Sequence, residues 1–438
     1  MKKRSIFILP VVLTFAGAAL AQSTPAASSK GNASVLAPGL TIDANNAAAY
    51  APYLPAAAQS AIQHGLRIQI LPTKRLDWST GFTDATEKYS SQVGLDAEDS
   101  ITNYVAGAPF PTVALSDPKA AVKIAYNWHM GPFMPDDFSL APWGSFAYSN
   151  VTPDTIQPED DYDYICEQFT FLRFTHRTEV DPRPTIGSNS EGFEWKARCN
   201  QWTATAAGNR GEGSGIWIRF VDPHRGDEFY GFDSQTRRIK RYGAAFVPIN
   251  ETCRSCHQPY WAYALPKTED YTYRVLGTAS LLACLTANDE PAGLVPGERG
   301  LKIGEEPFEL RNAYILEMTP KTQTGGNLRS LIYVDTEAYV WVAAEFFEGS
   351  ERTASAIPLW RSHPSSSGGN LFDLAGEFYV PDRQPQMSPN AEIHSLNTAK
   401  EYPRWFFRTL WPAHNIFEQK INMGDVSEPS FSPQSLSR

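Results

Sequence analysis

From residue 143 onward the sequence repeats one local pattern: a short run of β-branched and aromatic residues, followed by a polar or Gly/Pro-containing turn. Such runs form strands, and such turns connect them. Several runs are apolar on both faces, as expected of a strongly curved antiparallel sheet with material on its concave side. The pattern predicts a mainly β fold, with strands at residues 146–151, 162–175, 192–203, 215–221, 228–232, 237–242, 271–275, 308–318, 328–334, 340–347, 357–360 and 371–379.

Before residue 131 the sequence pattern predicts helices instead of strands. Residues 43–64 are Ala-rich and predict a helix in two pieces, because Pro55 interrupts the run. Residues 117–130 predict another helix, with Asp117 as the N-cap and Pro118 at the first helical position. The apolar residues of this second helix are spaced to form one buried face.

The N-terminus carries the three parts of a secretory leader. Basic residues at positions 2–4 precede an apolar stretch at 6–20, and Ala19-Leu20-Ala21 gives the small-x-small pattern of a cleavage site. The apolar stretch is shorter than the about 20 residues that span a bilayer, which disfavours a membrane anchor. We therefore predict export to the periplasm, with association with the outer membrane as a further option. The predicted organisation is a signal peptide at 1–21, a flexible arm at 22–40 and one large domain at 41–438.

The charge of the chain excludes one functional class. The 38 basic and 48 acidic residues give a net charge of −10. Loss of the three basic residues of the leader leaves 35 against 48, a net charge of −13. A nucleic-acid-binding protein needs a basic footprint, so no nucleic-acid partner is expected.

The motif with the clearest chemistry is Cys253-Arg254-Ser255-Cys256-His257, a C-x-x-C-H. Two thiols at this spacing can add to the two vinyl groups of one porphyrin, and the adjacent imidazole can then bind the iron. The motif predicts one c-type haem, with Cys253 and Cys256 as attachment residues and His257 as the proximal ligand of the haem iron. Attachment of such a haem requires an exported chain, which the predicted leader supplies.

Two other interpretations of these cysteines stay open. They could form a small disulfide, or they could join His257 in a zinc site, although the sequence supplies no second Cys pair or His pair for that site. The sixth ligand of the haem iron is not assigned, because several residues could supply it. The candidates are Met130, Met134, Met318, Met387, His129, His176, His224 and His363.

The remaining cysteines allow one further pairing. Cys166 and Cys199 lie in neighbouring predicted strands and could form a disulfide after export. Cys284 is then left over. No nucleophile elbow and no H-E-x-x-H occurs, so no catalytic residue is predicted. A basic strip at 237–241 predicts a solvated strand edge, with binding of an acidic lipid head group or a redox partner as the alternative.

Several segments together resemble one bacterial family, the exported proteins grouped as domain of unknown function 1329. In chain order these segments are AAAQSAIQHG with ILPTKR, GAPFPT, AYNWHM, TRRIKRY, RNAYILEMTPK, LIYVDTEAYVW and FSPQSLSR. The resemblance spans residues 41–438. That family is similar to outer-membrane lipoprotein-sorting proteins.

The resemblance implies a fold and a class of ligand. The implied fold is an unclosed antiparallel half-barrel with lid helices, enclosing an apolar cavity that holds lipids or other hydrophobic molecules. It implies no catalytic residue, and Asn127, Trp128 and His129 match a family motif without an assigned role. Ordinary members carry no C-x-x-C-H in the segment that here spans residues 243–268.

Two functions are therefore expected as alternatives. The first is a carrier or binding protein for a hydrophobic small molecule or lipid in the cell envelope, with transient membrane contact. The second is a monohaem cytochrome that transfers electrons to a redox partner, or a haem-dependent oxidoreductase acting on a hydrophobic substrate.

Overall fold

The computed structural model describes most of the chain from residue 36 onward, and these residues belong to one compact unit. The predicted leader, residues 22–35 of the predicted arm and the C-x-x-C-H motif all lie outside the described residues. The described residues are 36–63, 65–132, 135–140, 143–148, 162–187, 189–206, 209–233, 236–242, 267–287, 295–297, 300–302, 304–322, 328–382, 405–409, 420–424 and 426–437.

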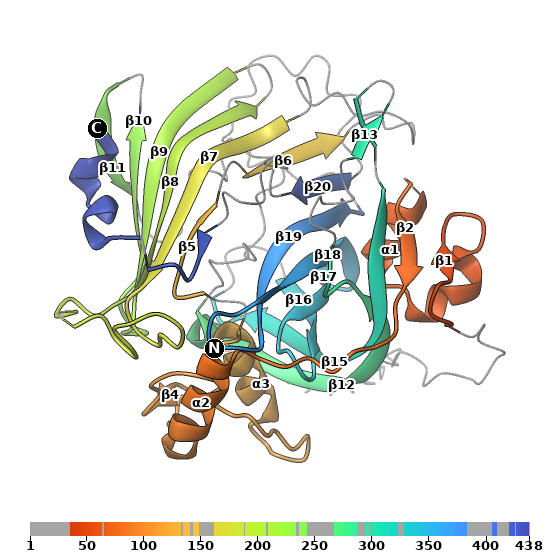
Figure 1. The fold of residues 1–438 in the computed structure, drawn as a ribbon, viewed down its shortest axis with the longest axis horizontal. Helices are drawn as coiled ribbons and strands as arrows, with labels where there is room; N and C mark the ends of the chain where they lie inside the picture. Colours follow the sequence, from red (N-terminus) through yellow and green to blue (C-terminus); the bar gives the residue numbers. More distant parts are fainter. Residues whose placement is uncertain are drawn as a thin grey trace, which may run out of the picture. The chain divides into compact units, whose positions relative to one another are not determined.

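One large sheet contains most of the described strands (Figure 1). Along its main ladder each strand pairs with the next in antiparallel orientation. From one edge to the other the order is β12 (Tyr271–Ala283), β15 (Glu305–Pro320), β16 (Leu328–Asp335), β17 (Trp341–Glu348), β18 (Glu351–Pro364), β19 (Asn370–Pro381), β20 (Trp405–Thr409), β6 (Trp143–Tyr148), β7 (Tyr162–Arg173), β8 (Phe193–Ala206), β9 (Asn209–Phe220), β10 (Glu228–Asp233) and β11 (Arg238–Tyr242).

The two edge strands of this ladder, β11 and β12, follow one another in the sequence. Among the described residues no pairing joins them, so the curved sheet does not close into a barrel (Figure 1). This confirms the predicted fold class, an unclosed antiparallel half-barrel. On β12 exposed and half-buried residues alternate from Tyr271 to Ser280, as expected where one face of an edge strand meets solvent.

Short strands extend the sheet and form two small ribbons. β1 (Thr41–Ile42) pairs with β2 (Arg67–Ile70), and β2 runs parallel to the start of β15. β5 (Asp137–Leu140) pairs with β7 and with β21 (Lys420–Ile421). The separate ribbons are β3 (Gly94–Leu95) with β4 (Ile101–Thr102) and β13 (Val295–Gly297) with β14 (Gly300–Lys302).

The predicted helix at 43–64 is present in two pieces. The first is a 3₁₀ helix, Ala47–Tyr53, and the second is α1 (Ala56–Gln63), which packs on β18 and β19. Pro55 lies between them, as predicted. No helix in the described part of the chain is long and apolar enough to cross a bilayer.

Helix α3 (Ala120–His129) is the predicted helix at 117–130, shortened at its start. The segment before it is a turn, in which the Asp117 carboxylate accepts a hydrogen bond from Lys119 N at 2.8 Å. Asp117 therefore caps this turn, and Lys119 occupies the N-cap of the helix. α3 packs beside β12 and buries every residue from Ile124 to His129.

Helix α2 (Thr80–Tyr89) was not predicted. Its N-cap is Ser79, whose hydroxyl oxygen accepts a hydrogen bond from Phe82 N at 3.2 Å. The segment has three Thr and one Gly within ten residues, so its helix propensity is low. Contacts with the rest of the fold, described below, compensate for that propensity.

Two further regions carry local structure. The segment at 285–307 contains the β13–β14 ribbon and the buried Leu285. The C-terminal tail contains 3₁₀ helices at Glu428–Phe431 and Pro433–Ser437, where Phe431 and Leu436 pack with residues of β7 to β9.

Candidate functional site

The buried side chain of Asn127 links helix α3 to the preceding chain. Asn127 Nδ2 donates to Phe110 O at 2.6 Å, and Asn127 Oδ1 accepts from Phe110 N at 2.9 Å. These bonds join the GAPFPT and AYNWHM segments, both of which carry the family resemblance. The same helix presents Tyr126, His129 and Met130 to a cavity.

That cavity, of about 260 Å³, is the candidate site. Its wall combines aromatic rings with charged and polar side chains, a combination typical of ligand pockets. Five parts of the chain contribute: the β4 region, α3, the loop after β7, strands β8 and β9, and the segment before β12. The lining residues are Ile101, Asn103, Tyr104, Tyr126, His129, Met130, His176, Glu194, Trp195, Arg219, Phe220, Val221, Pro223, Lys267, Thr268 and Glu269.

Two buried histidines line the cavity. His129 Nδ1 contacts Thr268 Oγ1, and its Nε2 has no hydrogen-bond partner among the described residues. His176 Nδ1 lies 2.7 Å from Val105 O. Because a carbonyl oxygen only accepts, His176 Nδ1 carries the proton and Nε2 presents a lone pair.

Both imidazoles are uncharged at neutral pH. Burial, with a smaller effect from the Arg219 charge, lowers the pKa of His129 to about 3. Burial also lowers the pKa of His176 to about 4, against the hydrogen bond to Val105, which raises it. The cavity therefore contains two neutral imidazoles, which can accept or donate hydrogen bonds.

A carboxyl group and a guanidinium lie on the adjacent strands β8 and β9. Arg219 is held by Asp227, whose Oδ2 accepts from Nε at 3.0 Å and from Nη2 at 2.8 Å. Arg219 also lies over the Trp195 ring, at 4.9 Å from its centroid. Burial raises the pKa of the Glu194 carboxyl, while the charges of Arg219 and Arg173 oppose that rise.

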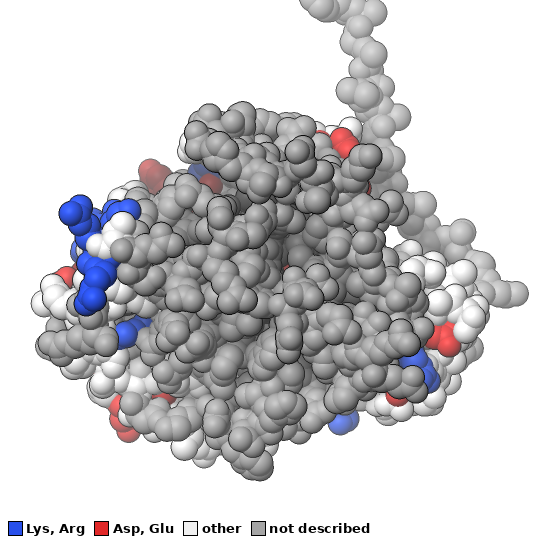
Figure 2. All heavy atoms as spheres, turned by 90° about the horizontal axis from the view of Figure 1, so that it is seen from above, with Lys and Arg blue, Asp and Glu red and all other residues white. Residues whose placement is uncertain are grey.

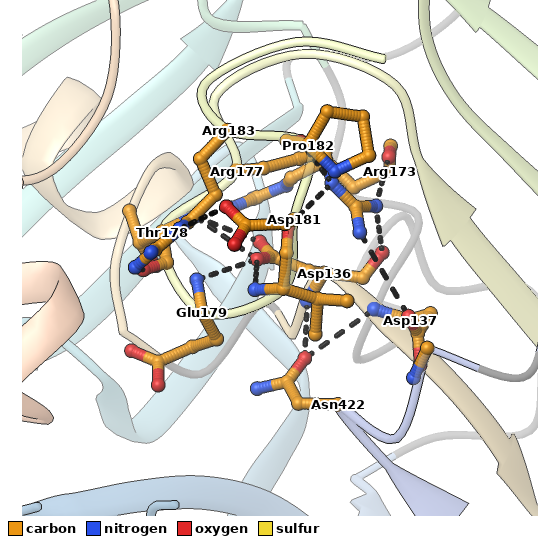
Figure 3. A network of polar contacts seen from close by, with 12 residues as sticks. Asp136, Asp137, Arg173, Arg177, Thr178, Glu179, Asp181, Pro182, Arg183 and Asn422 are labelled. Atoms are coloured by element: carbon orange, nitrogen blue, oxygen red, sulfur yellow. Dashed lines mark hydrogen bonds and ion pairs between the residues drawn. The ribbon is translucent and has the colours of Figure 1, made fainter. Parts of the chain in front are cut away.

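The loop that carries His176 is fixed by the buried carboxylate of Asp136 (Figure 3). Asp136 Oδ2 accepts from the backbone N of Thr178 at 3.0 Å, Glu179 at 2.6 Å and Val180 at 2.8 Å. Such a row of amides around one anion is a strong, charge-assisted arrangement. It holds the backbone directly after His176 in one conformation.

The guanidinium of Arg177 completes this network from the other side of the loop (Figure 3). Its Nη1 donates to Arg173 O at 2.7 Å, and its Nε donates to Val180 O and Pro182 O, each at 3.1 Å. Asn422, near the C-terminus, accepts from Asp136 N at 2.7 Å through its Oδ1. The loop is thereby tied to β7 and to the C-terminal segment.

Glu179 connects the same loop to α2. Its carboxylate accepts from the hydroxyls of Ser79, Ser365 and Ser367, the last two at 2.7 Å and 2.8 Å. Ser79 is the N-cap of α2, and the other two serines lie in the turn between β18 and β19. These contacts explain why α2 forms despite its low propensity.

The predicted haem attachment residues Cys253, Cys256 and His257 lie outside the described residues, so the haem stays a prediction. Of the candidate axial ligands, His129, His176 and Met130 line the cavity, Met318 is buried in β15, and His224 is on the exposed turn after β9. For the other three candidates the structure gives no side-chain position: Met134, Met387 and His363.

Cys199 is buried and disulfide-bonded. Its pairing with Cys166 stays a prediction, because the side chain of Cys166 lies outside those described. In the ladder, Cys199 is opposite Phe169 and Cys166 is opposite Trp202, so a direct bridge would need a departure from this register. Cys284 is a free, buried thiol.

The basic strip lies on β11, as predicted. Arg237, Arg238, Lys240 and Arg241 are exposed, and Figure 2 shows Lys and Arg side chains gathered at the end of the molecule where β10 and β11 lie. Arg241 also pairs with Glu228, at 2.7 Å. This agrees with the interpretation as a solvated strand edge.

Sequence reasoning missed the most polar part of the cavity. Glu194 and Arg219 lie inside predicted strands, where a charged residue usually marks the solvent-facing side. The available signal was weak: Arg219 stands between Ile218 and Phe220 in an otherwise apolar run. Among the described residues no group of three or more His, Cys, Asp or Glu is arranged to hold a metal ion.

The chain was compared with known proteins. Three solved structures are similar over nearly their whole length. A DUF1329 family protein from Desulfovibrio piger is 11% identical, with a TM-score of 0.43, and covers 73% of this chain and 100% of its own. A putative outer membrane lipoprotein-sorting protein domain from Vibrio parahaemolyticus is 9% identical, with a TM-score of 0.38, and covers 72% of this chain and 97% of its own. A LolA superfamily protein from Nitrosomonas europaea is 10% identical, with a TM-score of 0.34, and covers 72% of this chain and 99% of its own.

No curated protein matches the chain. The model of one family, described as protein of unknown function (DUF1329), matches residues 41–352, which is more than half of the sequence. The chain therefore belongs to the DUF1329 family.

Proposed function

We propose that this protein is an exported binding protein or carrier for hydrophobic, lipid-like molecules of the cell envelope, and that it carries one covalent c-type haem. The observation that carries the proposal is the cavity beside α3, in an unclosed half-barrel. Aromatic residues such as Tyr104, Trp195 and Phe220 line it. Burial of apolar ligand surface against such walls contributes about 25 cal/mol per Å², so binding needs no catalytic group.

Export and location belong to the same proposal. The leader at 1–21 supports secretion into the periplasm, and the resemblance to lipoprotein-sorting proteins supports transient contact with a membrane, including the outer membrane. The exposed basic strip on β11 is the described surface best suited to acidic head groups.

The test is direct. Protein purified from the periplasm is extracted with organic solvent, and the extract is analysed by mass spectrometry. The extracted protein is then titrated with a fluorescent fatty acid. Co-purification of a hydrophobic molecule, and its rebinding, would support the carrier. A clean extract together with no binding of the fluorescent probe would contradict it.

The second candidate is a monohaem cytochrome that transfers electrons or oxidises a hydrophobic substrate. The C-x-x-C-H at 253–257 favours it, since this spacing is suited to covalent haem attachment. Cys253 and Cys256 would form the thioether links and His257 would bind the iron, which would supply a redox centre.

A pyridine haemochrome spectrum of protein made with the haem-attachment machinery tests the haem that both candidates include. A colourless protein would rule out the second candidate and remove the haem from the first. If haem is present, ligand binding by the Cys253→Ala, Cys256→Ala double variant decides its role. Unchanged lipid binding without haem would make the haem secondary to the carrier function.

A further inference from the structure

We propose that the cavity beside α3 recognises a neutral, hydroxyl-bearing group, which donates hydrogen bonds to Glu194 and His176 and meets Nε2 of His129. This inference rests on the proposed function, because the group would be the head group of the bound amphipathic molecule. It assigns a chemical class to a ligand that the fold leaves open.

The cations of the cavity wall already have partners. Arg219 donates through Nε and Nη2 to Asp227, whose carboxylate balances its charge. Lys267 Nζ donates to the carbonyl oxygens of Asp222 at 2.9 Å and Arg225 at 2.7 Å. An anionic head group would therefore compete with existing partners, and it would also meet the carboxyl of Glu194.

The wall also presents hydrogen-bond acceptors to the cavity. His176 Nε2 presents a lone pair, because Nδ1–H is used on Val105 O. The Glu194 carboxyl also lines the cavity. His129 Nε2 is buried and without a partner in the described part of the chain. Buried polar atoms without partners are costly, so a ligand that satisfies them gains affinity.

A cationic head group fits this site poorly. The guanidinium charges of Arg219 and Arg173 act on Glu194, and the Asp227 carboxylate acts on it in the opposite sense. An ammonium beside Glu194 would lose its hydration in a poorly solvated site. A neutral hydroxyl donates to the same acceptors at a smaller desolvation cost.

The size of the cavity points to a head group rather than a whole lipid. Its volume of about 260 Å³ lies just below the range of about 300–1,000 Å³ for ligand pockets. This size suits a glycerol- or sugar-sized group. The rings of Tyr104, Trp195 and Phe220 offer flat apolar surface to the carbon-bound faces of such a group.

The experiment uses the mature full-length protein and amphiphiles that share one lauryl or dodecyl chain. Monolauroylglycerol carries a neutral diol, lauric acid an anion, and dodecyltrimethylammonium a cation. Free glycerol tests whether the hydroxyl group needs a tail. Affinities are measured by calorimetry for wild type, for Glu194→Gln and for the matched control Glu87→Gln, since Glu87 is exposed on α2.

Wild type is expected to bind monolauroylglycerol about tenfold or more tightly than the two charged amphiphiles, as the loss of one charge-assisted hydrogen bond would imply. Glu194→Gln should abolish the preference over lauric acid, because it removes the carboxyl that an anion would meet, and Glu87→Gln should keep that preference. The head-group comparison on wild type requires no variant to fold.

Equal binding of all three amphiphiles would overturn the inference while leaving the carrier function in place. So would a preference over lauric acid that survives in folded Glu194→Gln. Binding of glycerol alone, with no amphiphile bound, would assign the cavity to a free polyol and contradict the carrier. If neither glycerol nor any amphiphile binds, both proposals are wrong.

Discussion

Arg311 and Asp335 form a buried bidentate ion pair that joins the neighbouring strands β15 and β16. Arg311 Nε lies 2.8 Å from Asp335 Oδ2, and Nη2 lies 3.1 Å from Oδ1. The side chains are 3% and 0% exposed. Arg311 Nη1 also donates to Lys74 O at 2.8 Å. Three segments of the family resemblance, ILPTKR, RNAYILEMTPK and LIYVDTEAYVW, therefore meet at one guanidinium.

The first prediction concerns this pair. Arg311→Ala should lower the free energy of unfolding by about 3–5 kcal/mol, because it leaves a buried carboxylate without its partner. Urea unfolding at neutral pH measures the loss. The matched control is Arg274→Ala, which breaks the pair with Glu317 at a site where Arg274 is 62% exposed and should cost about 1 kcal/mol or less. Equal losses for the two variants would contradict the importance of the buried pair.

The second prediction concerns the link between α3 and the preceding turn. Asn127→Ala leaves Phe110 N and Phe110 O without their partner, both in a buried site. Two such groups should cost about 2–5 kcal/mol of unfolding free energy. Thermal melting of this variant is compared with that of Asn45→Ala, since Asn45 is exposed.

If α3 holds the cavity wall in place, Asn127→Ala should also weaken ligand binding at temperatures below the melting point of the variant. Tyr126 and His129, which flank Asn127 in the sequence, both line the cavity. A variant that melts like Asn45→Ala would show that the turn and the helix hold their positions independently.

The third prediction concerns the loop after β7. Asp136→Ala removes the acceptor of three backbone N–H groups, from Thr178, Glu179 and Val180. We expect a loss of about 3 kcal/mol or more of unfolding free energy. Hydrogen exchange, measured by mass spectrometry, should be accelerated relative to wild type more strongly in residues 174–187 than in β12. Uniform acceleration over the whole chain would mean that the carboxylate stabilises the fold globally rather than this loop.

Most strands of the main ladder could be located, because their runs of β-branched and aromatic residues end at turns. β20 was not predicted. The order of the strands could not be predicted, since pairing joins segments as distant as β6 and β20. Helix α2 was missed for a related reason: the contacts of Glu179 with Ser365 and Ser367 are not visible in the local sequence.

The candidate site was predicted only in part. AYNWHM was singled out by resemblance, and its His129 lines the cavity. Glu194 and Arg219 looked like ordinary strand residues, because their burial depends on how α3 and the segment before β12 pack over β8 and β9. A charge in a strand acquires its role from elements that are distant in the sequence.

The last prediction concerns acid stability. His129 is buried, and its pKa of about 3 in the folded protein lies below the ordinary value of 6.5. Between these two values the unfolded chain binds a proton that the folded protein does not. Stability is therefore fully present above pH 6.5 and falls as the pH drops toward 3.

His176, with a pKa of about 4, acts in the same direction. Each histidine should contribute a slope of up to ~1.4 kcal/mol per pH unit within that window. Urea unfolding at pH 7, 6 and 5 measures the slope. The His129→Gln variant should show a smaller slope. At pH 5 it should keep a larger fraction of its unfolding free energy at pH 7 than wild type does. The same substitution at the exposed His224 is the matched control. A His129→Gln slope equal to that of wild type would mean that this imidazole is solvated in the folded protein, and the cavity would then lack the neutral group that we assign to it.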